Sequence, residues 1–60
     1  MINEQLSLDQ KRIAIQTLQI VVDEANAAIK LLAENDEDHA RQEIDLIRRR
    51  VEVVQKFFYE

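Results

Sequence analysis

The chain has 60 residues, of which 8 are basic and 12 acidic, giving a formal net charge of −4. It contains no cysteine, glycine or proline, which excludes disulfides, thiolate zinc sites and glycine-rich phosphate-binding loops. Sixty residues form at most one small domain, and chains this short often need a partner chain to bury enough apolar surface. No segment approaches the roughly 18 to 20 apolar residues of a membrane span, so the sequence predicts a soluble, cytoplasmic protein.

Composition favours helix along almost the whole chain. Hydrophobic residues make up 47% of it, and the residues on which β-hairpins and irregular loops rely for their turns are missing. We therefore predict an all-α fold consisting of one antiparallel helical hairpin. Its first helix is expected over about 7–34, its turn at about 35–36 and its second helix over about 37–59.

The first predicted helix begins with a capping signal. Ser7 is followed three residues later by Gln10, the spacing at which the two side chains satisfy each other's backbone amides. Apolar residues then recur at steps of three and four, which predicts one face packed against the second helix. This row, interrupted only by Lys11, consists of Leu8, Ile15, Leu18, Val22, Ala25, Ile29 and Leu32. A row of smaller residues widens it on one side and would allow close helix approach: Ala14, Val21 and Ala28.

The stretch LLAENDEDHARQ, residues 31–42, breaks the helical pattern. Asn35 tolerates a left-handed backbone and is suited to end the first helix. Either Asn35 or Asp36 is suited to cap the second helix, and acids in its first turn complement the helix dipole. Asp36 and His39 have an acid-x-x-His spacing that some helix-bundle metal sites use, but capping already explains these residues. We predict no metal, no cofactor and no catalytic residue, and hence no enzyme.

The second predicted helix repeats the apolar spacing without interruption. Its row consists of Ala40, Ile44, Ile47, Val51, Val54 and Phe58. Charges around the row have opposite neighbours three or four residues away, a spacing worth a few tenths of a kcal/mol per pair. The expected pairs are Glu37–Arg41, Asp45–Arg49, Arg48–Glu52 and Glu52–Lys56.

A second apolar stripe lies outside these two rows, and we predict it to be a dimer or partner interface. It consists of Ile13, Ile20, Ala27, Leu31, Leu46, Val53 and Phe57. A lone hairpin would expose this stripe, and contiguous exposed apolar surface usually marks an interface. We therefore expect two hairpins to form a four-helix bundle. The acidic turns favour placing the two turns at opposite ends.

These features predict a small homo-oligomeric protein-interaction module, namely an adaptor, inhibitor or regulator that acts through apolar helix faces. Its partners would be a second copy and another protein. The alternative is a nucleic-acid-binding regulator that uses the basic residues of the second helix: Arg41, Arg48, Arg49 and Lys56. The overall acidic charge disfavours that alternative, because non-specific affinity for nucleic acid comes mainly from phosphate neutralisation.

Three known families share parts of this pattern. ARQEIDLIRRRVEVVQ is similar to the first helix of AroQ-type chorismate mutases, but the later helices of that fold have no counterpart here. LSLDQ is similar to the start of the small phycobilisome-degradation adaptors, whose further aromatic, Leu-Lys and Trp features are missing. The plasmid copy-number regulator Rop has the expected architecture and size without a shared motif. None of these resemblances assigns the chain to a family.

Overall fold

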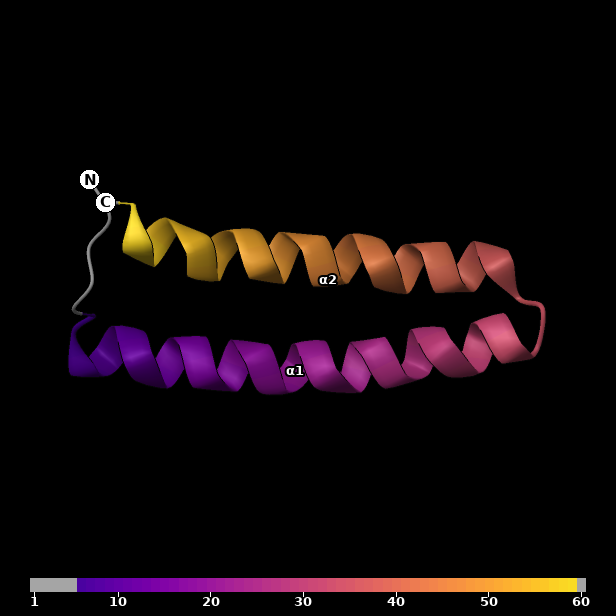
Figure 1. The fold of residues 1–60 in the computed structure, drawn as a ribbon, viewed down its shortest axis with the longest axis horizontal. Helices are drawn as coiled ribbons and strands as arrows, with labels where there is room; N and C mark the ends of the chain where they lie inside the picture. Colours follow the sequence, from indigo (N-terminus) through magenta and orange to yellow (C-terminus); the bar gives the residue numbers. More distant parts are fainter. Residues whose placement is uncertain (1–5, 60) are drawn as a thin grey trace.

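Two antiparallel helices, α1 (Leu8–Ala33) and α2 (Glu37–Phe58), lie side by side in the computed structural model, which describes residues 6–59 (Figure 1). The predicted all-α helical hairpin is therefore confirmed. The radius of gyration is 13.8 Å, whereas a compact chain of this length would have about 10 Å. Because each helix has only one neighbour in this single layer, most of its circumference is left uncovered. Neither α1 nor α2 is long and apolar enough to cross a membrane.

The start of α1 is fixed by the predicted capping box. The backbone N–H of Gln10 donates to the Ser7 hydroxyl oxygen at 3.1 Å, and the backbone N–H of Ser7 donates to the Gln10 side-chain oxygen at 3.0 Å. Both bonds satisfy amides that have no partner within the helix. The prediction made from the Ser7–Gln10 spacing is confirmed.

The turn between the helices relies on two neighbouring residues with different roles. Asn35 has a φ of 63°, the left-handed conformation that asparagine adopts more readily than most residues. The backbone N–H of Asp36 then donates to the carbonyl oxygen of Leu31 at 2.8 Å, which closes the end of α1. The side chain of Asp36 caps α2. Of the two capping residues considered from the sequence, the structure uses Asp36.

The most deeply buried apolar residues between the helices have small side chains. The buried apolar residues are Ala14 and Ala28 from α1 and Ala40 and Val54 from α2. Ala40 is only 1% exposed. Small side chains at a helix contact permit the shortest axis separations, toward about 8 Å. The row expected only to widen the contact on α1 is therefore its centre.

The predicted contact row of α1 is wrong. Its six large residues are between 44% and 65% exposed: Leu8, Ile15, Leu18, Val22, Ile29 and Leu32. They follow a regular heptad spacing, which indicates a packed face but does not say which neighbour packs on it. The row predicted for α2 fares better, since Ile47, Val51 and Phe58 are half-buried beside buried Ala40 and Val54, and only Ile44 is exposed.

Candidate interaction surfaces

Within residues 6–59, one charged pair crosses the helix contact. The Arg50 guanidinium Nε of α2 donates to the Glu24 carboxylate Oε1 of α1 at 2.6 Å. Glu24 is the buried charged residue of the described chain, at 9% exposure, whereas the Arg50 side chain keeps 37%. Arg50 interrupts the apolar line of Leu46, Val53 and Phe57 in the sequence, and its guanidinium binds a carboxylate of its own chain.

Sequence reasoning missed the role of Glu24. The available signal was its spacing, because Glu24 lies three residues after Val21 and four before Ala28. It therefore continues the small-residue row that forms the true contact. Glu24 and Arg50 contact each other across the two helices. The residues that neighbour Glu24 on α1 and those that neighbour Arg50 on α2 therefore lie on the same side of the hairpin.

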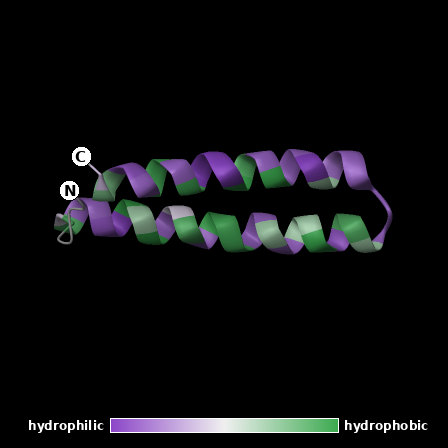
Figure 2. Cartoon of the chain, turned by 45° about the horizontal axis from the view of Figure 1, so that its top comes forward, coloured by the Kyte–Doolittle hydropathy of each residue, from purple (hydrophilic) through white to green (hydrophobic). Residues whose placement is uncertain are grey.

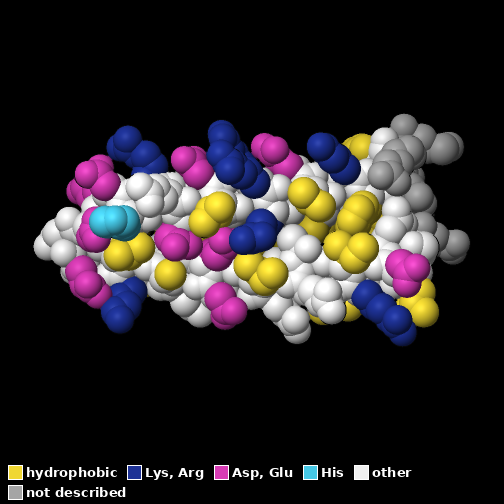
Figure 3. Space-filling view, turned by 180° about the vertical axis from the view of Figure 1, so that it is seen from behind, with side chains coloured by type: hydrophobic (Ala, Val, Ile, Leu, Met, Phe, Trp, Pro, Cys, Tyr) yellow, Lys and Arg dark blue, Asp and Glu magenta, His cyan; other side chains and the backbone are white. Residues whose placement is uncertain are grey.

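The first apolar surface surrounds this charged pair and is named the Arg50 face. Ile20 and Ala27 lie one helical turn to either side of Glu24, and Leu46 and Val53 lie in the same relation to Arg50. Figure 3 shows this side of the molecule, with apolar groups divided by charged ones. The surface comprises the stripe predicted as an interface, namely Ile13, Ile20, Ala27, Leu31, Leu46, Val53 and Phe57. Of these, Ala27, Leu31 and Phe57 are half-buried and the other four are exposed.

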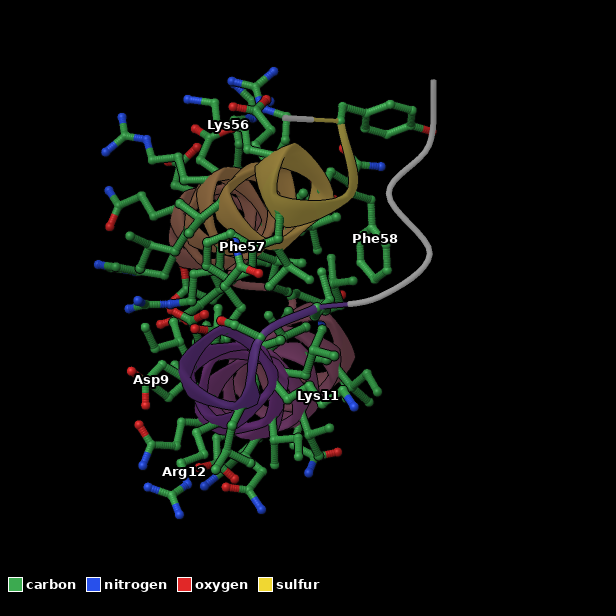
Figure 4. All side chains as sticks on the ribbon, turned by 90° about the vertical axis from the view of Figure 1, so that its left-hand side faces the viewer. Asp9, Lys11, Arg12, Lys56, Phe57 and Phe58 are labelled. Carbon is green, nitrogen blue, oxygen red and sulfur yellow. The ribbon has the colours of Figure 1, made fainter. Side chains whose placement is uncertain are left out.

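The second apolar surface is named the heptad face, and sequence reasoning had assigned it to the hairpin contact. It comprises Leu8, Ile15, Leu18, Val22, Ile29 and Leu32 of α1 with Ile44, Val51 and Phe58 of α2. Lys11 and Phe58 project to one side of the hairpin, away from Asp9 (Figure 4). Residues seven positions apart lie on the same side of a helix, so Leu18 lies on the side of Lys11, and Val51 lies on the side of Phe58. The heptad-face rows of α1 and α2 therefore lie on the same side of the hairpin. Hydrophobic residues extend along α1, whereas the outside of α2 is largely hydrophilic (Figure 2).

The basic residues proposed for nucleic acid lie on the outside of α2. Arg41, Arg48, Arg49 and Lys56 are all exposed. Acidic and basic side chains alternate along that edge (Figure 3), so the four do not form a continuous basic stripe. Among residues 6–59 the ion pairs are Glu24–Arg50 and Asp36–His39. The four pairs expected within α2 are therefore not formed.

The acidic turn holds the second ion pair. Nδ1 of His39 lies 2.8 Å from Oδ2 of Asp36 and 2.9 Å from Oδ1. The side-chain hydrogen bond from His39 is the main cause that lowers the pKa of Asp36, and the same bond raises the pKa of His39 above its ordinary value of 6.5. Both side chains are solvent-accessible. The pair thus closes the first turn of α2 and offers no enclosed reaction site.

Two further features of the described residues bear on a metal site and on a pocket. Within residues 6–59, no three His, Asp or Glu side chains come together in a way that could hold a metal ion. A shallow, open depression near the end of α2 is lined by Glu52, Gln55, Lys56 and Tyr59. No family model, curated protein or solved structure matches the chain.

Proposed function

We propose that the protein is a self-associating helical-hairpin module that acts through protein contacts, as an adaptor, inhibitor or small regulator. The observation that carries this proposal is the heptad face, where six large apolar residues of one helix are exposed together. Soluble monomers rarely expose a contiguous apolar patch of this kind. Covering it with a further pair of helices would produce a four-helix bundle.

The surface area of the chain supports self-association. A folded monomer of 7.1 kDa would expose about 4,100 Å² by the scaling observed for compact proteins. This chain exposes 4987 Å². The difference, about 900 Å², is close to the roughly 800 Å² that each partner buries in a standard interface. The hairpin thus exposes more surface than a compact protein of its mass. The excess is about the area that one partner buries in a standard interface.

The two faces differ in chemistry, and we propose that they bind different partners. The heptad face is continuous and carries one charge, Lys11, among its rows. The Arg50 face is broken by the Glu24–Arg50 pair. An interface that mixes apolar and charged groups is typical of contacts between proteins that also exist apart. In this proposal the heptad face binds a second copy and the Arg50 face binds a different protein.

A matched pair of substitutions tests this assignment. Leu18 on the heptad face is 44% exposed, and Ile20 on the Arg50 face is 42% exposed. Leu18→Asp should convert the dimer to a monomer, because it would place a carboxylate in the apolar interface. Ile20→Asp should leave the dimer intact and abolish capture of the partner protein from an extract of the native host. Sedimentation equilibrium at micromolar concentration measures the first effect.

Two results would contradict the proposal. A wild-type protein that stays folded and monomeric at these concentrations would remove the requirement for self-association. A dimer lost in Ile20→Asp but kept in Leu18→Asp would show that the Arg50 face, as predicted from the sequence, binds the second copy.

A second candidate function is nucleic-acid binding, favoured by the exposure of Arg41, Arg48, Arg49 and Lys56. The acids between them weaken any field that would attract phosphates. Binding of this type loses affinity steeply as salt concentration rises. Fluorescence titration of a labelled RNA hairpin and a DNA duplex at two salt concentrations tests it, with the Arg48→Gln, Arg49→Gln double variant as the control.

A further inference from the structure

We infer that a second copy of the chain packs on the heptad face with its turn at the opposite end, so that each α1 lies antiparallel against the partner's α1. This inference rests on the proposed self-association and adds the orientation and register of the two copies. It follows from how the rows of each helix match themselves, from the fold of the hairpin and from the distribution of charge.

Two-fold symmetry permits two ways to stack two hairpins face to face. When the turns lie at opposite ends, α1 contacts the partner's α1 and α2 contacts the partner's α2. When the turns lie at the same end, α1 contacts the partner's α2. Each arrangement therefore demands a different match between apolar rows.

The row on α1 matches itself when read in the opposite direction. In the register that overlaps the whole row, Leu8 lies against the partner's Leu32. Ile15 lies against the partner's Ala25, and Leu18 against the partner's Val22. These pairs are symmetric about residue 20. Apart from the layer of Lys11, every layer combines at least one large apolar side chain with another apolar one, as coiled-coil packing requires.

The heptad-face residues of α2 match themselves in the same way. Ala40 and Val54 are buried against α1 and are not available to a partner. The residues that can meet it are therefore Ile44, Val51 and Phe58. Ile44 lies against the partner's Phe58, and Val51 against the partner's Val51. These pairs are symmetric about residue 51.

In the folded hairpin, the centres of the two self-matching rows lie at nearly the same level, so a single two-fold axis can pass through both. α1 ends at Ala33 and α2 begins at Glu37, so the chain folds back about residue 35. Residue 20 of α1 is then level with about residue 50 of α2, one residue from the centre of the α2 row. One two-fold axis thus satisfies the self-matching rows of both helices.

Charge favours the same arrangement. Four acids lie in or beside the turn, Glu34, Asp36, Glu37 and Asp38, whereas Lys11 and Arg12 lie near the open end. Turns at the same end would bring together four carboxylates from each chain. Turns at opposite ends separate these clusters by about 39 Å, the length of a 26-residue helix, far beyond the Debye length of about 8 Å. Each cluster then lies toward the partner's basic end.

Lys11 interrupts the apolar row but agrees with this arrangement. It is level with the partner's Ile29, near one end of the bundle. Its aliphatic stem can cover the apolar row while its ammonium group reaches outward toward the partner's acidic turn. In the alternative arrangement Lys11 would lie far from both turns.

Introduced thiols test the arrangement, because the natural chain has no cysteine. A mixture of the Ile15→Cys and Ala25→Cys variants should form a covalent dimer on mild oxidation, since these positions face each other only when the turns lie at opposite ends. A mixture of Ala25→Cys and Ile44→Cys reports the arrangement with both turns at one end. Each variant oxidised alone is the control, and non-reducing electrophoresis is the measurement.

The outcomes separate this inference from the proposed function. Covalent dimers from the Ile15→Cys and Ala25→Cys mixture alone support the inference. Covalent dimers from the Ala25→Cys and Ile44→Cys mixture, or from neither mixture while sedimentation shows a dimer, overturn the inference and leave self-association intact. A wild-type monomer in sedimentation overturns both.

Discussion

The two helices of the hairpin differ in how they use their apolar residues. α1 has six charged residues among 26, and most of its large apolar side chains are exposed. α2 has ten charged residues among 22. Its apolar residues form one narrower row that mostly faces α1. α1 therefore presents apolar surface in two directions, whereas α2 presents it mainly in one.

The residues that hold α1 against α2 therefore differ from those that would join two hairpins. The buried part of the contact between α1 and α2 consists of three alanines, one valine and the Glu24 carboxylate paired with Arg50, while larger residues such as Ile47 and Phe57 are only half-buried. The contact therefore buries limited apolar area. At about 25 cal/mol per Å², such a contact gives a modest stabilisation for a chain of this length. In the proposed dimer, the large residues of α1 would supply the remaining burial.

The largest expected effect comes from enlarging the closest point of contact between the helices. Ala40→Leu places three extra heavy atoms where Ala40 is 1% exposed, so the helices must move apart. Overpacking of this kind costs about 3 kcal/mol in free energy of unfolding. For a domain of about 60 residues, that loss lowers the thermal midpoint by more than about 10 °C.

Ala33→Leu is the matched control, because Ala33 is exposed at the end of α1. Its free energy of unfolding should change by no more than about 0.5 kcal/mol. Thermal unfolding followed by circular dichroism measures both variants. If both changed the midpoint equally, the small residues would not be what brings α1 and α2 together.

A smaller effect is expected from the ion pair between the helices. Glu24→Gln should lower the free energy of unfolding by about 1 to 2 kcal/mol, because it weakens a charge-assisted hydrogen bond of a buried carboxylate. The solvent exposure of Arg50 keeps the loss below that of a fully buried pair.

Arg50→Gln and the double variant complete a cycle for this pair. The double variant should lose less stability than the sum of the two single variants, since both remove the same interaction. Urea unfolding gives the three free energies. Simple additivity would show that Glu24 and Arg50 stabilise the hairpin through other contacts.

The sequence predicted the hairpin and its ends because local chemistry determines them. Ser7 with Gln10, the left-handed Asn35 and the cap at Asp36 each act within four residues, so their side chains and spacing were sufficient. The row of α2 that was predicted to face α1 was largely right, because α2 has one dominant apolar direction.

The contact row of α1 could not be predicted in the same way. Two rows on α1 have heptad spacing, and reasoning from hydrophobicity selects the one with larger residues. The hairpin instead uses Ala14, Val21 and Ala28, since the small row permits closer approach. Glu24 was missed for the same reason, because a charged residue is not expected in a contact until its partner Arg50 is known. The assignment of either face to a partner stays a prediction.

The smallest expected effect concerns the start of α2, where the Asp36–His39 pair has no counterpart in α1. The pKa of His39 is raised by its hydrogen bond to Asp36, so protonated His39 stabilises the folded state. This contribution is complete below the ordinary pKa of 6.5 and is lost as pH rises through the higher pKa of the folded state. The pKa of Asp36 is lowered from 3.8, so its contribution is lost only as pH falls below that value. Stability from the pair is therefore greatest between about pH 4 and pH 6.5.

The difference in thermal midpoint between the wild type and His39→Ala should be largest in this window and shrink toward alkaline pH. Glu37→Gln, which changes a neighbouring acid that does not contact His39, should keep the pH dependence of the wild type. An equal pH dependence in the wild type and His39→Ala would show that the pair does not stabilise α2.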